Sequence, residues 1–284
     1  MLSSIKITRQ EYESGKITSD HLAQANQALR EDGVVVLEDV VATSHLETLR
    51  GRMALDLEKI LSRPDAPFQF NMGNVQQDPP PFEPYLFRDI LVNDIVIAVT
   101  KSILGAGLKN VFYSGNTALP SDSRQPVHAD TGQLWPNLEV STPAYQLVVN
   151  MPLVDMSEEN GSTEIWPGTH LDTTVAIQAV DLKVPKEKLA RRRAISPPVQ
   201  PTVKLGSAVI RDIRLWHAGM PNRTKVARPM LAMIHSVTWW PDSPIPFAKG
   251  SERYLEHPDL RTVAEFIDGP IDYLFHHSAH DLQK

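Results

Sequence analysis

The chain has no cysteine among its 284 residues, and this absence removes several kinds of chemistry at once. Disulfide bonds, thiolate metal sites and a cysteine nucleophile are all excluded. Long apolar runs are missing too, because no stretch approaches the roughly 18 apolar residues that a membrane-spanning helix needs. The N-terminus has no apolar segment of signal-peptide length. We therefore expect no membrane span and take the cytoplasm as the default location.

The chain also lacks an excess of positive charge. It carries 28 Lys and Arg against 34 Asp and Glu, a formal net charge of −6. A general nucleic-acid-binding domain would normally be basic overall, so no nucleic-acid partner is expected. Glycine is outnumbered by proline, 14 to 23. So many stiff chain reversals favour a β-rich, loop-rich architecture over a helix bundle.

Helical patterns fill the first third of the chain, and strand patterns follow. A capping box of Ser44 and Glu47 predicts the start of one helix, and the proline-rich stretch 62–85 is typical of a long loop. The other expected helices cover residues 19–32 and 86–104, and the expected strands cover residues 34–37, 111–119, 145–154, 203–212 and 230–238. Helices first and strands after predict helices packed outside a β-sandwich or barrel.

We expect a single domain over residues 1–284. Its parts would be a helical region at about 19–105, a barrel core at about 108–240 and a C-terminal extension at about 241–284. A basic run at 183–193 interrupts this pattern, and we interpret it as a solvated loop.

The motif His128-Ala129-Asp130 is the most specific local signal. Residues i and i+2 of a strand point to the same face, so the imidazole and the carboxylate would project side by side. His217 follows much later, after another predicted strand. Two histidines and one carboxylate form the facial triad of non-haem Fe(II) oxygenases, which leaves metal positions open for substrate and O₂. Zinc can use the same three ligands with a water, so these residues alone leave the metal undecided.

Two further polar residues fit such a site. Arg228 stands at the start of a predicted strand, and its planar guanidinium suits bidentate capture of a carboxylate. Gln125 stands three residues before His128, where its amide can donate to an acid bound at the metal. The segment 160–170 has the pattern of two turns around a short strand.

Taken in order, these motifs resemble the phytanoyl-CoA dioxygenase family of Fe(II)/2-oxoglutarate oxygenases. The motifs that carry the resemblance are His128-x-Asp130, Asn160-Gly161, Pro167-Gly168-Thr169-His170, and His217 with Arg228. The resemblance extends from about residue 30 to about 240, and the approach Gln125-Pro126-Val127-His128 is most similar to the fungal natural-product branch, which includes meroterpenoid and alkaloid oxygenases. It implies a mainly β fold with flanking helices, in which a double-stranded β-helix (a jelly roll, cupin-like) holds the active site in its mouth.

The resemblance also implies residue roles. The ligands of Fe(II) would be His128, Asp130 and His217. Arg228 would pair with the distal carboxylate of the cosubstrate 2-oxoglutarate, and Gln125 and Thr163 match positions that contact it. The implied reaction oxidises an unactivated C–H bond with O₂ and releases succinate and CO₂. Halogenating relatives replace the carboxylate ligand with a small residue, so Asp130 disfavours halogenation. Relatives in the fungal branch are often dimers, and a homodimer is expected on that ground.

The sequence offers several candidates for a substrate pocket. In an extended proline-rich stretch, Phe68, Phe70 and Met72 would turn to one side. Trp135 and Trp216 flank the metal motifs, and Tyr113, Asn116 and Gln133 are candidate hydrogen-bonding groups. The alternative for each apolar side chain is ordinary core packing. This lining favours a medium-sized lipophilic or polycyclic small-molecule substrate.

Two rival functions stay open at this point. One is an acyl-CoA hydroxylase of the phytanoyl type, in which the basic run 183–193 would meet the CoA phosphates. The other is a non-catalytic metal-binding barrel. The remaining histidines receive no role: His170 is expected to be structural, and His276, His277 and His280 are expected to be solvent-exposed on a polar tail.

Overall fold

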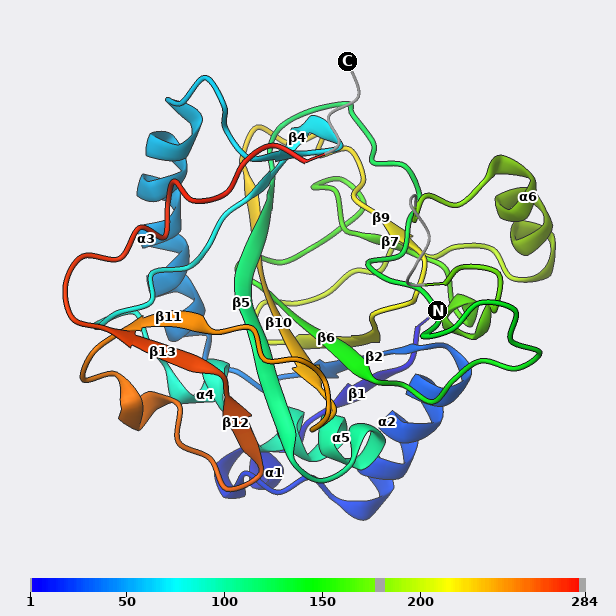
Figure 1. The fold of residues 1–284 in the computed structure, drawn as a ribbon, viewed down its shortest axis with the longest axis horizontal. Coiled ribbons are helices and arrows are strands. Elements are labelled where there is room, and N and C mark those ends of the chain that lie inside the picture. The colour runs from blue at the N-terminus through cyan, green and yellow to red at the C-terminus, as the bar shows by residue number, and fades with distance from the viewer. Residues whose placement is uncertain (1, 177–181, 281–284) are drawn as a thin grey trace.

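The computed structural model describes residues 2–176 and 182–280. Its strands are β1 (Ser4–Lys6), β2 (Val34–Glu38), β3 (Phe68–Gln69), β4 (Asn71–Gln76), β5 (Leu108–Ala118), β6 (Gln146–Pro152), β7 (Glu164–Ile165), β8 (Ala208–Asp212), β9 (His217–Ala218), β10 (Arg228–Ser236), β11 (Ile245–Ala248), β12 (Leu260–Thr262) and β13 (Ala264–Ile267). Within the described residues the largest sheet has nine strands, in the order β1-β2-β8-β6-β10-β5-β4-β3, with β12 paired to β5 (Figure 1). Its central strands are antiparallel, whereas β1 and β12 join it in parallel.

A second, narrower sheet is built from short ladders. β7 pairs with β9, and isolated bridges join His128 to both Lys183 and His217, and Ile165 to Val199. Residues of both sheets line one cavity. The predicted fold class, a mainly β jelly roll with flanking helices, is therefore confirmed.

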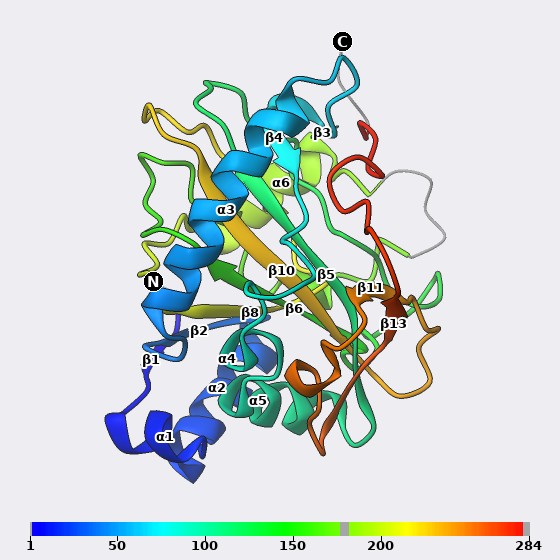
Figure 2. The same ribbon diagram turned by 90° about the vertical axis from the view of Figure 1, so that its left-hand side faces the viewer.

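The helices cover the outside of the large sheet. They are α1 (Arg9–Ser14), α2 (Ser19–Glu31), α3 (Thr43–Leu61), α4 (Arg88–Leu91), α5 (Asp94–Leu104) and α6 (Lys186–Ile195), with short 3₁₀ turns at Thr169–Leu171 and Glu252–Tyr254. In Figure 2, α3 runs along the outside of the strands, and α2, α4 and α5 gather at one end of them. None of the helices among the described residues is long and apolar enough for a membrane crossing.

Strand alternation divides the large sheet into a packing face and a cavity face. Val149 of β6 and Leu231 of β10 pack in the main hydrophobic core with helix residues such as Leu46. Their strand neighbours Asn150 and Met230 line the cavity. Because successive side chains of a strand point to opposite faces, the same strands build the core and the site.

Several predicted boundaries differ from the structure. The capping box is wrong: α3 begins at Thr43, and its N-cap Ala42 makes no side-chain cap. Instead, the Ala42 backbone N–H donates to the Asp89 carboxylate at 2.9 Å, so a distant acid replaces the local cap. The expected helix 86–104 is divided because Asn93 caps α5, accepting from two backbone N–H groups.

Three segments also differ in type. The expected loop 62–85 contains the strands β3 and β4, which close the edge of the large sheet. The basic run 183–193 is mostly the helix α6, which buries none of its residues, rather than a loop. In 203–212 we expect two short strands separated by a glycine turn; the turn at Gly206 (φ 93°) and the second strand, β8, are present, whereas Val203 forms only an isolated bridge to Met156.

Candidate active site

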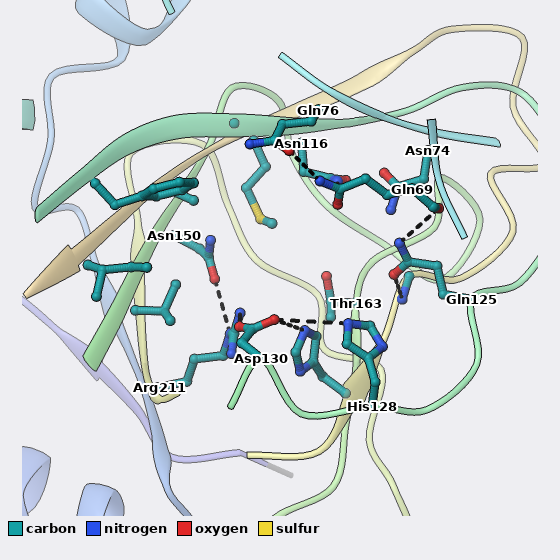
Figure 3. Close-up of a pocket in the computed structure, with 18 of the residues that line it drawn as sticks. Gln69, Asn74, Gln76, Asn116, Gln125, His128, Asp130, Asn150, Thr163 and Arg211 are labelled. Carbon is teal, nitrogen blue, oxygen red and sulfur yellow. Dashed lines mark hydrogen bonds and ion pairs between the residues drawn. The ribbon is translucent and has the colours of Figure 1, made fainter. Parts of the chain in front are cut away.

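The narrow sheet places the two motif histidines directly opposite each other. The His128 backbone N–H donates to the His217 carbonyl at 3.0 Å, and the reverse bond measures 2.9 Å. Their rings consequently lie side by side, with centroids 4.4 Å apart. One carboxylate oxygen of Asp130 lies 3.4 Å from His217 Nε2 and 4.0 Å from His128 Nε2. The structure thus brings together the three predicted ligands (Figure 3).

Both histidines present the nitrogen that a metal needs. His128 Nδ1 lies 2.9 Å from the Pro126 carbonyl, and His217 Nδ1 lies 3.0 Å from the Leu215 carbonyl. A carbonyl only accepts, so each Nδ1 carries the proton and each Nε2 keeps its lone pair toward Asp130. Burial, with a smaller contribution from nearby positive charge, lowers the pKa of His128 to about 4. The imidazole is therefore neutral and ready to ligate at physiological pH.

Arg211 of β8 holds the other side of the Asp130 carboxylate. Its Nη2 donates to Asp130 Oδ2 at 2.7 Å, while Asp130 Oδ1 faces the histidines. Burial by itself would raise the pKa of Asp130, but Arg211 and the two neighbouring histidines together outweigh it, and the pKa falls well below its usual range. Asp130 is therefore ionised and fixed with one oxygen free for a cation.

Arg228 of β10 offers unused donors inside the barrel. The side chain is 2% exposed, and its Nη2 donates to the Gly161 carbonyl at 2.8 Å. Within the described residues, its Nε and Nη1 have no hydrogen-bond partner. Burial lowers the pKa of Arg228 only to about 10, so the guanidinium keeps its charge at neutral pH. A buried cation with two orphaned N–H groups fits a carboxylate ligand.

Gln125 and Thr163 line the same cavity as Arg228 and the triad. The Gln125 side-chain oxygen accepts from the Gly219 backbone N–H at 2.8 Å. The amide NH₂ group of Gln125 makes only a long 3.5 Å contact, with the Gln69 carbonyl. Figure 3 shows the Thr163 hydroxyl pointing into the cavity beside His128. Both side chains can thus donate to a ligand next to the triad.

The cavity has a volume of about 230 Å³ and two different sides. One side is rich in amides, as Figure 3 shows above the triad: Gln69, Asn74, Gln76, Asn116 and Gln125. The other is apolar and formed mainly by Phe112, Val148, Met230, Ala232 and Ile234. Such a lining accepts a ligand that has both hydrogen-bonding oxygens and hydrocarbon.

One predicted substrate residue lines this cavity, and another contacts an iron ligand. Asn116 lines the cavity directly. Phe70 is not a lining residue, but its ring lies against the His128 ring, with centroids 4.6 Å apart and planes tilted by 43°. Phe70 has a positive φ of 61°, and this kink between β3 and β4 breaks the alternation that would have aligned it with its neighbours.

The other predicted substrate residues lie elsewhere. Met72 and Trp135 are 69% and 59% exposed, because the kink and a surface turn direct them to solvent. Trp216 packs on the face opposite His217, with Trp166 and Val127. Tyr113 and Gln133 also lie outside the cavity, for different reasons.

Tyr113 points away from the cavity because it alternates with Phe112 along β5, and its ring stacks on Phe247 at 5.8 Å. Gln133 is 1% exposed. Its amide donates to the carbonyls of His170 and Asp172, and its oxygen accepts from Thr142 and Arg214. Every polar group of Gln133 thus forms hydrogen bonds that join loops. Neither Tyr113 nor Gln133 lines the cavity.

Arg211 is the main cavity residue that the sequence reasoning missed. The available signal was a charged residue inside the apolar run Val209-Ile210-Arg211, at a position that strand alternation turns to the opposite face from Ile210. The amides Gln69 and Asn74 carried no such signal, because they stand in a stretch that was expected to be a loop.

The fold and the site together define the class of protein. Together they show three features of an Fe(II)- and 2-oxoglutarate-dependent dioxygenase. These are a jelly-roll barrel, a convergent triad of two histidines and one carboxylate, and a buried guanidinium with unpaired N–H groups. The model of the family "Phytanoyl-CoA dioxygenase (PhyH)" matches residues 29–230. The chain belongs to this family, and its cofactors are accordingly Fe(II), 2-oxoglutarate and O₂.

Known proteins extend this result. The dioxygenase af480 of Aspergillus fumigatus is 28% identical over 212 residues, which cover 72% of this chain but only 63% of that protein. Among solved structures, AviO1 from Streptomyces viridochromogenes has a TM-score of 0.56 at 22% identity, covering 78% of this chain and 97% of its own. HygX from Streptomyces hygroscopicus, solved with nickel, 2-oxoglutarate and hygromycin B, has a TM-score of 0.55 at 14% identity, covering 81% and 91%. These two structures are similar in fold.

Proposed function

We propose that this dioxygenase oxidises an unactivated C–H bond of a medium-sized natural product that carries oxygen functions. The observation that carries the proposal is the meeting, in one cavity, of the triad with a buried, half-unpaired Arg228 and a row of amides. Bound iron, together with 2-oxoglutarate and O₂, supplies the oxidising power, and the protein supplies position and exclusion.

The chain's own residues divide the work. His128, Asp130 and His217 hold the iron, with each imidazole fixed by a backbone carbonyl and the carboxylate fixed by Arg211. Arg228 receives the distal carboxylate of 2-oxoglutarate through its two free N–H groups. Gln125 and Thr163 donate to the same cosubstrate near the triad. These roles follow from the donors that each side chain has left unpaired.

The lining supports a substrate more polar than the sequence suggested. Most of the apolar side chains expected as pocket walls lie outside the cavity, whereas amides of β3, β4 and β5 lie in it. A volume of about 230 Å³ is below the roughly 300–1,000 Å³ of ordinary ligand pockets. We therefore place the cosubstrate and the reacting end of the substrate in the cavity, with the rest of the substrate outside it.

HygX, which was solved with hygromycin B bound, and the dioxygenase af480 of Aspergillus fumigatus support this substrate class. An acyl-CoA substrate is the alternative. Two residues of α6 that could meet CoA phosphates are already engaged, since Arg192 donates to the Pro167 carbonyl and Arg193 lies over the Trp166 ring at 5.3 Å. A panel of polyoxygenated natural products beside a panel of CoA esters separates the two classes.

The first test is an anaerobic titration of the metal-free protein with Fe(II) and then 2-oxoglutarate, followed by the visible charge-transfer absorption. We expect a band that needs both components. Arg228→Met should weaken 2-oxoglutarate binding at least about tenfold, and Arg228→Lys should restore part of it, because lysine keeps the charge but loses the planar fork. A folded protein without the band would contradict the proposed site.

Turnover gives the second test. Conversion of 2-oxoglutarate to succinate without substrate should be measurable in the wild type and abolished by His128→Ala. Succinate formation that survives His128→Ala would show that the iron is held elsewhere.

A further inference from the structure

A second cluster of metal-ligand side chains lies outside the cavity. Asp78 follows β4, and the adjacent His276 and His277 belong to the C-terminal segment 268–280. Asp78 Oδ1 lies 2.8 Å from His277 Nε2, and Asp78 Oδ2 lies 3.2 Å from His276 Nε2. Figure 1 shows this segment, in red, reaching β4 from the far end of the chain. His276 is exposed, as expected, whereas His277 is only partly exposed, and both histidines pair with Asp78.

The donors in this cluster are oriented as metal ligands are. His276 Nδ1 lies 2.9 Å from the Asp272 carbonyl, so its proton sits there and its Nε2 faces Asp78. The Ser114 hydroxyl donates to the Asp78 carboxylate and fixes its plane. The side chain of Asp78 is only 14% exposed. Outer hydrogen bonds of this kind orient first-shell ligands in known metal sites.

Charge and spacing suit a cation held by all three side chains. The two imidazole rings lie 3.9 Å apart, so protonating both would place two like charges side by side. Two neutral imidazoles and one carboxylate around a divalent ion avoid this repulsion. The His277 and His276 nitrogens face different oxygens of Asp78, at 2.8 and 3.2 Å, and both distances are below the roughly 4 Å that two ligand atoms can span on one ion with bonds of about 2.0–2.1 Å.

We propose that Asp78, His276 and His277 form a site for a divalent transition metal of the zinc class, with one coordination position left for water. Imidazole and carboxylate ligands together suit such ions. No residue of the iron triad takes part in it. Asp78 follows the sheet strand β4, and the two histidines belong to the C-terminal segment 268–280. The bound ion would therefore link this segment to the barrel.

The C-terminal segment also contacts the active site through the residues that follow His277. Three residues after His277, His280 pairs with β3: its backbone N–H donates to Phe68 at 2.9 Å and its carbonyl accepts from Phe70 at 3.0 Å. Gln69, which lies between these two residues, lines the catalytic cavity, and the Phe70 ring lies against that of the iron ligand His128 with centroids 4.6 Å apart. An ion on Asp78 thus stabilises this wall of the cavity without entering it.

Counting bound Co²⁺ by equilibrium dialysis on the untagged full chain tests the proposal. The wild type should bind two equivalents, one at the triad and one at Asp78. His276→Gln/His277→Gln should bind one, and His128→Gln should bind one, at the other site. The remaining equivalent in each variant shows that the protein is folded. His45→Gln is the matched control, because it removes a histidine that pairs with a single carboxylate, Asp89, at 2.8 Å.

A wild type that binds one equivalent, lost only in His128→Gln, overturns the second site. Two equivalents that both persist in His276→Gln/His277→Gln overturn it as well. If the wild type binds one equivalent of Co²⁺ and only His276→Gln/His277→Gln loses it, the result supports the second site and contradicts the iron site. Limited proteolysis gives a separate readout: Zn²⁺ should slow cleavage of segment 268–280 at least about tenfold in His128→Gln, and have no such effect once both C-terminal histidines are replaced.

Discussion

Arg211 and the iron ligand Asp130 form a direct ion pair, 2.7 Å between Nη2 and Oδ2, while the opposite carboxylate oxygen faces His217. Among the described residues, the metal-free site thus already contains a cation beside its carboxylate. Arg211 acts as a positioning residue, since it contacts a ligand of the iron rather than the iron itself. It also keeps a buried Nη1 with no partner among the described residues.

Replacing Arg211 with Met should destabilise the metal-free protein. The loss leaves Asp130 unpaired, and we expect about 1–2 kcal/mol, less than for a fully buried pair, because Asp130 is 33% exposed toward the cavity. Saturating Co²⁺ should reduce the difference, since the ion then neutralises the carboxylate. Urea denaturation with chelator and with Co²⁺ measures both values. Lys204→Met, which removes an exposed pair with Asp155 at 2.7 Å, should change the stability much less, because solvent screens an exposed pair.

Replacing Gln125 with Glu should weaken binding of 2-oxoglutarate at least about tenfold, because two like charges would then face each other. Glu still accepts from the Gly219 backbone N–H, so the local fold stays intact. Gln125→Met, which loses the donor without adding charge, should give a smaller loss. The absorbance titration of the iron-loaded protein gives both dissociation constants. Equal affinities in all three proteins would remove Gln125 from the site.

Phe70 provides a test of backbone strain beside the iron. Its φ of 61° is unfavourable for any side chain with a Cβ atom and free for glycine. Phe70→Ala and Phe70→Gly both delete the ring that contacts His128, and the Gly variant should be the more stable by about 1 kcal/mol. Urea unfolding of the two variants measures this difference. A more stable Ala variant would show that the kink carries no strain.

His235 should make the protein sensitive to acid. It is 1% exposed, and its Nδ1 lies 2.9 Å from the Thr100 hydroxyl. Burial, aided by the nearby His257, lowers the pKa of His235 to about 3. Between the unfolded value near 6.5 and about 3, the unfolded chain binds the proton and the folded chain does not. Folding stability therefore falls as the pH falls through this window.

His235→Asn keeps a partner for Thr100 and removes the titrating group. Below pH 6.5, the wild type should lose about 1.4 kcal/mol more unfolding free energy per pH unit than this variant. Urea unfolding at several pH values between 7 and 4 measures the two slopes, and parallel slopes would contradict the assignment. A slope in the variant itself is expected, since other buried groups also titrate.

The sequence predicted the parts of the site that depend on local spacing. His128 and Asp130 converge as their i, i+2 spacing predicts, although His128 forms only an isolated bridge there. The same alternation puts Tyr113 and Asn116 on opposite faces, so grouping both in the pocket was wrong. Other parts depend on strand order. Arg211 reaches Asp130 only because β8 lies beside β6 in the large sheet, and Asp78 meets His277 across 199 residues of sequence. Such contacts have no signature in a single sequence.

The strands β3 and β4 show the same limit. The prolines around them and their own polar residues indicate a loop, yet β4 pairs with β5 on one side and β3 on the other, and these two strands give the cavity Gln69, Asn74 and Gln76. Tertiary pairing overrides local preference there, as it does often at sheet edges.

The two guanidinium groups that line the cavity, those of Arg211 and Arg228, also determine its net charge. Among the described residues that line it, Arg211 and Arg228 against the carboxylate of Asp130 leave one surplus positive charge. A ferrous ion adds two, and dianionic 2-oxoglutarate cancels two, so the loaded cavity is still cationic. In a space this small and dry, a protonated amine close to the iron would be repelled, whereas a phenolate, enolate or carboxylate would be attracted. The interior thus carries the opposite sign to the chain as a whole, whose net charge is −6.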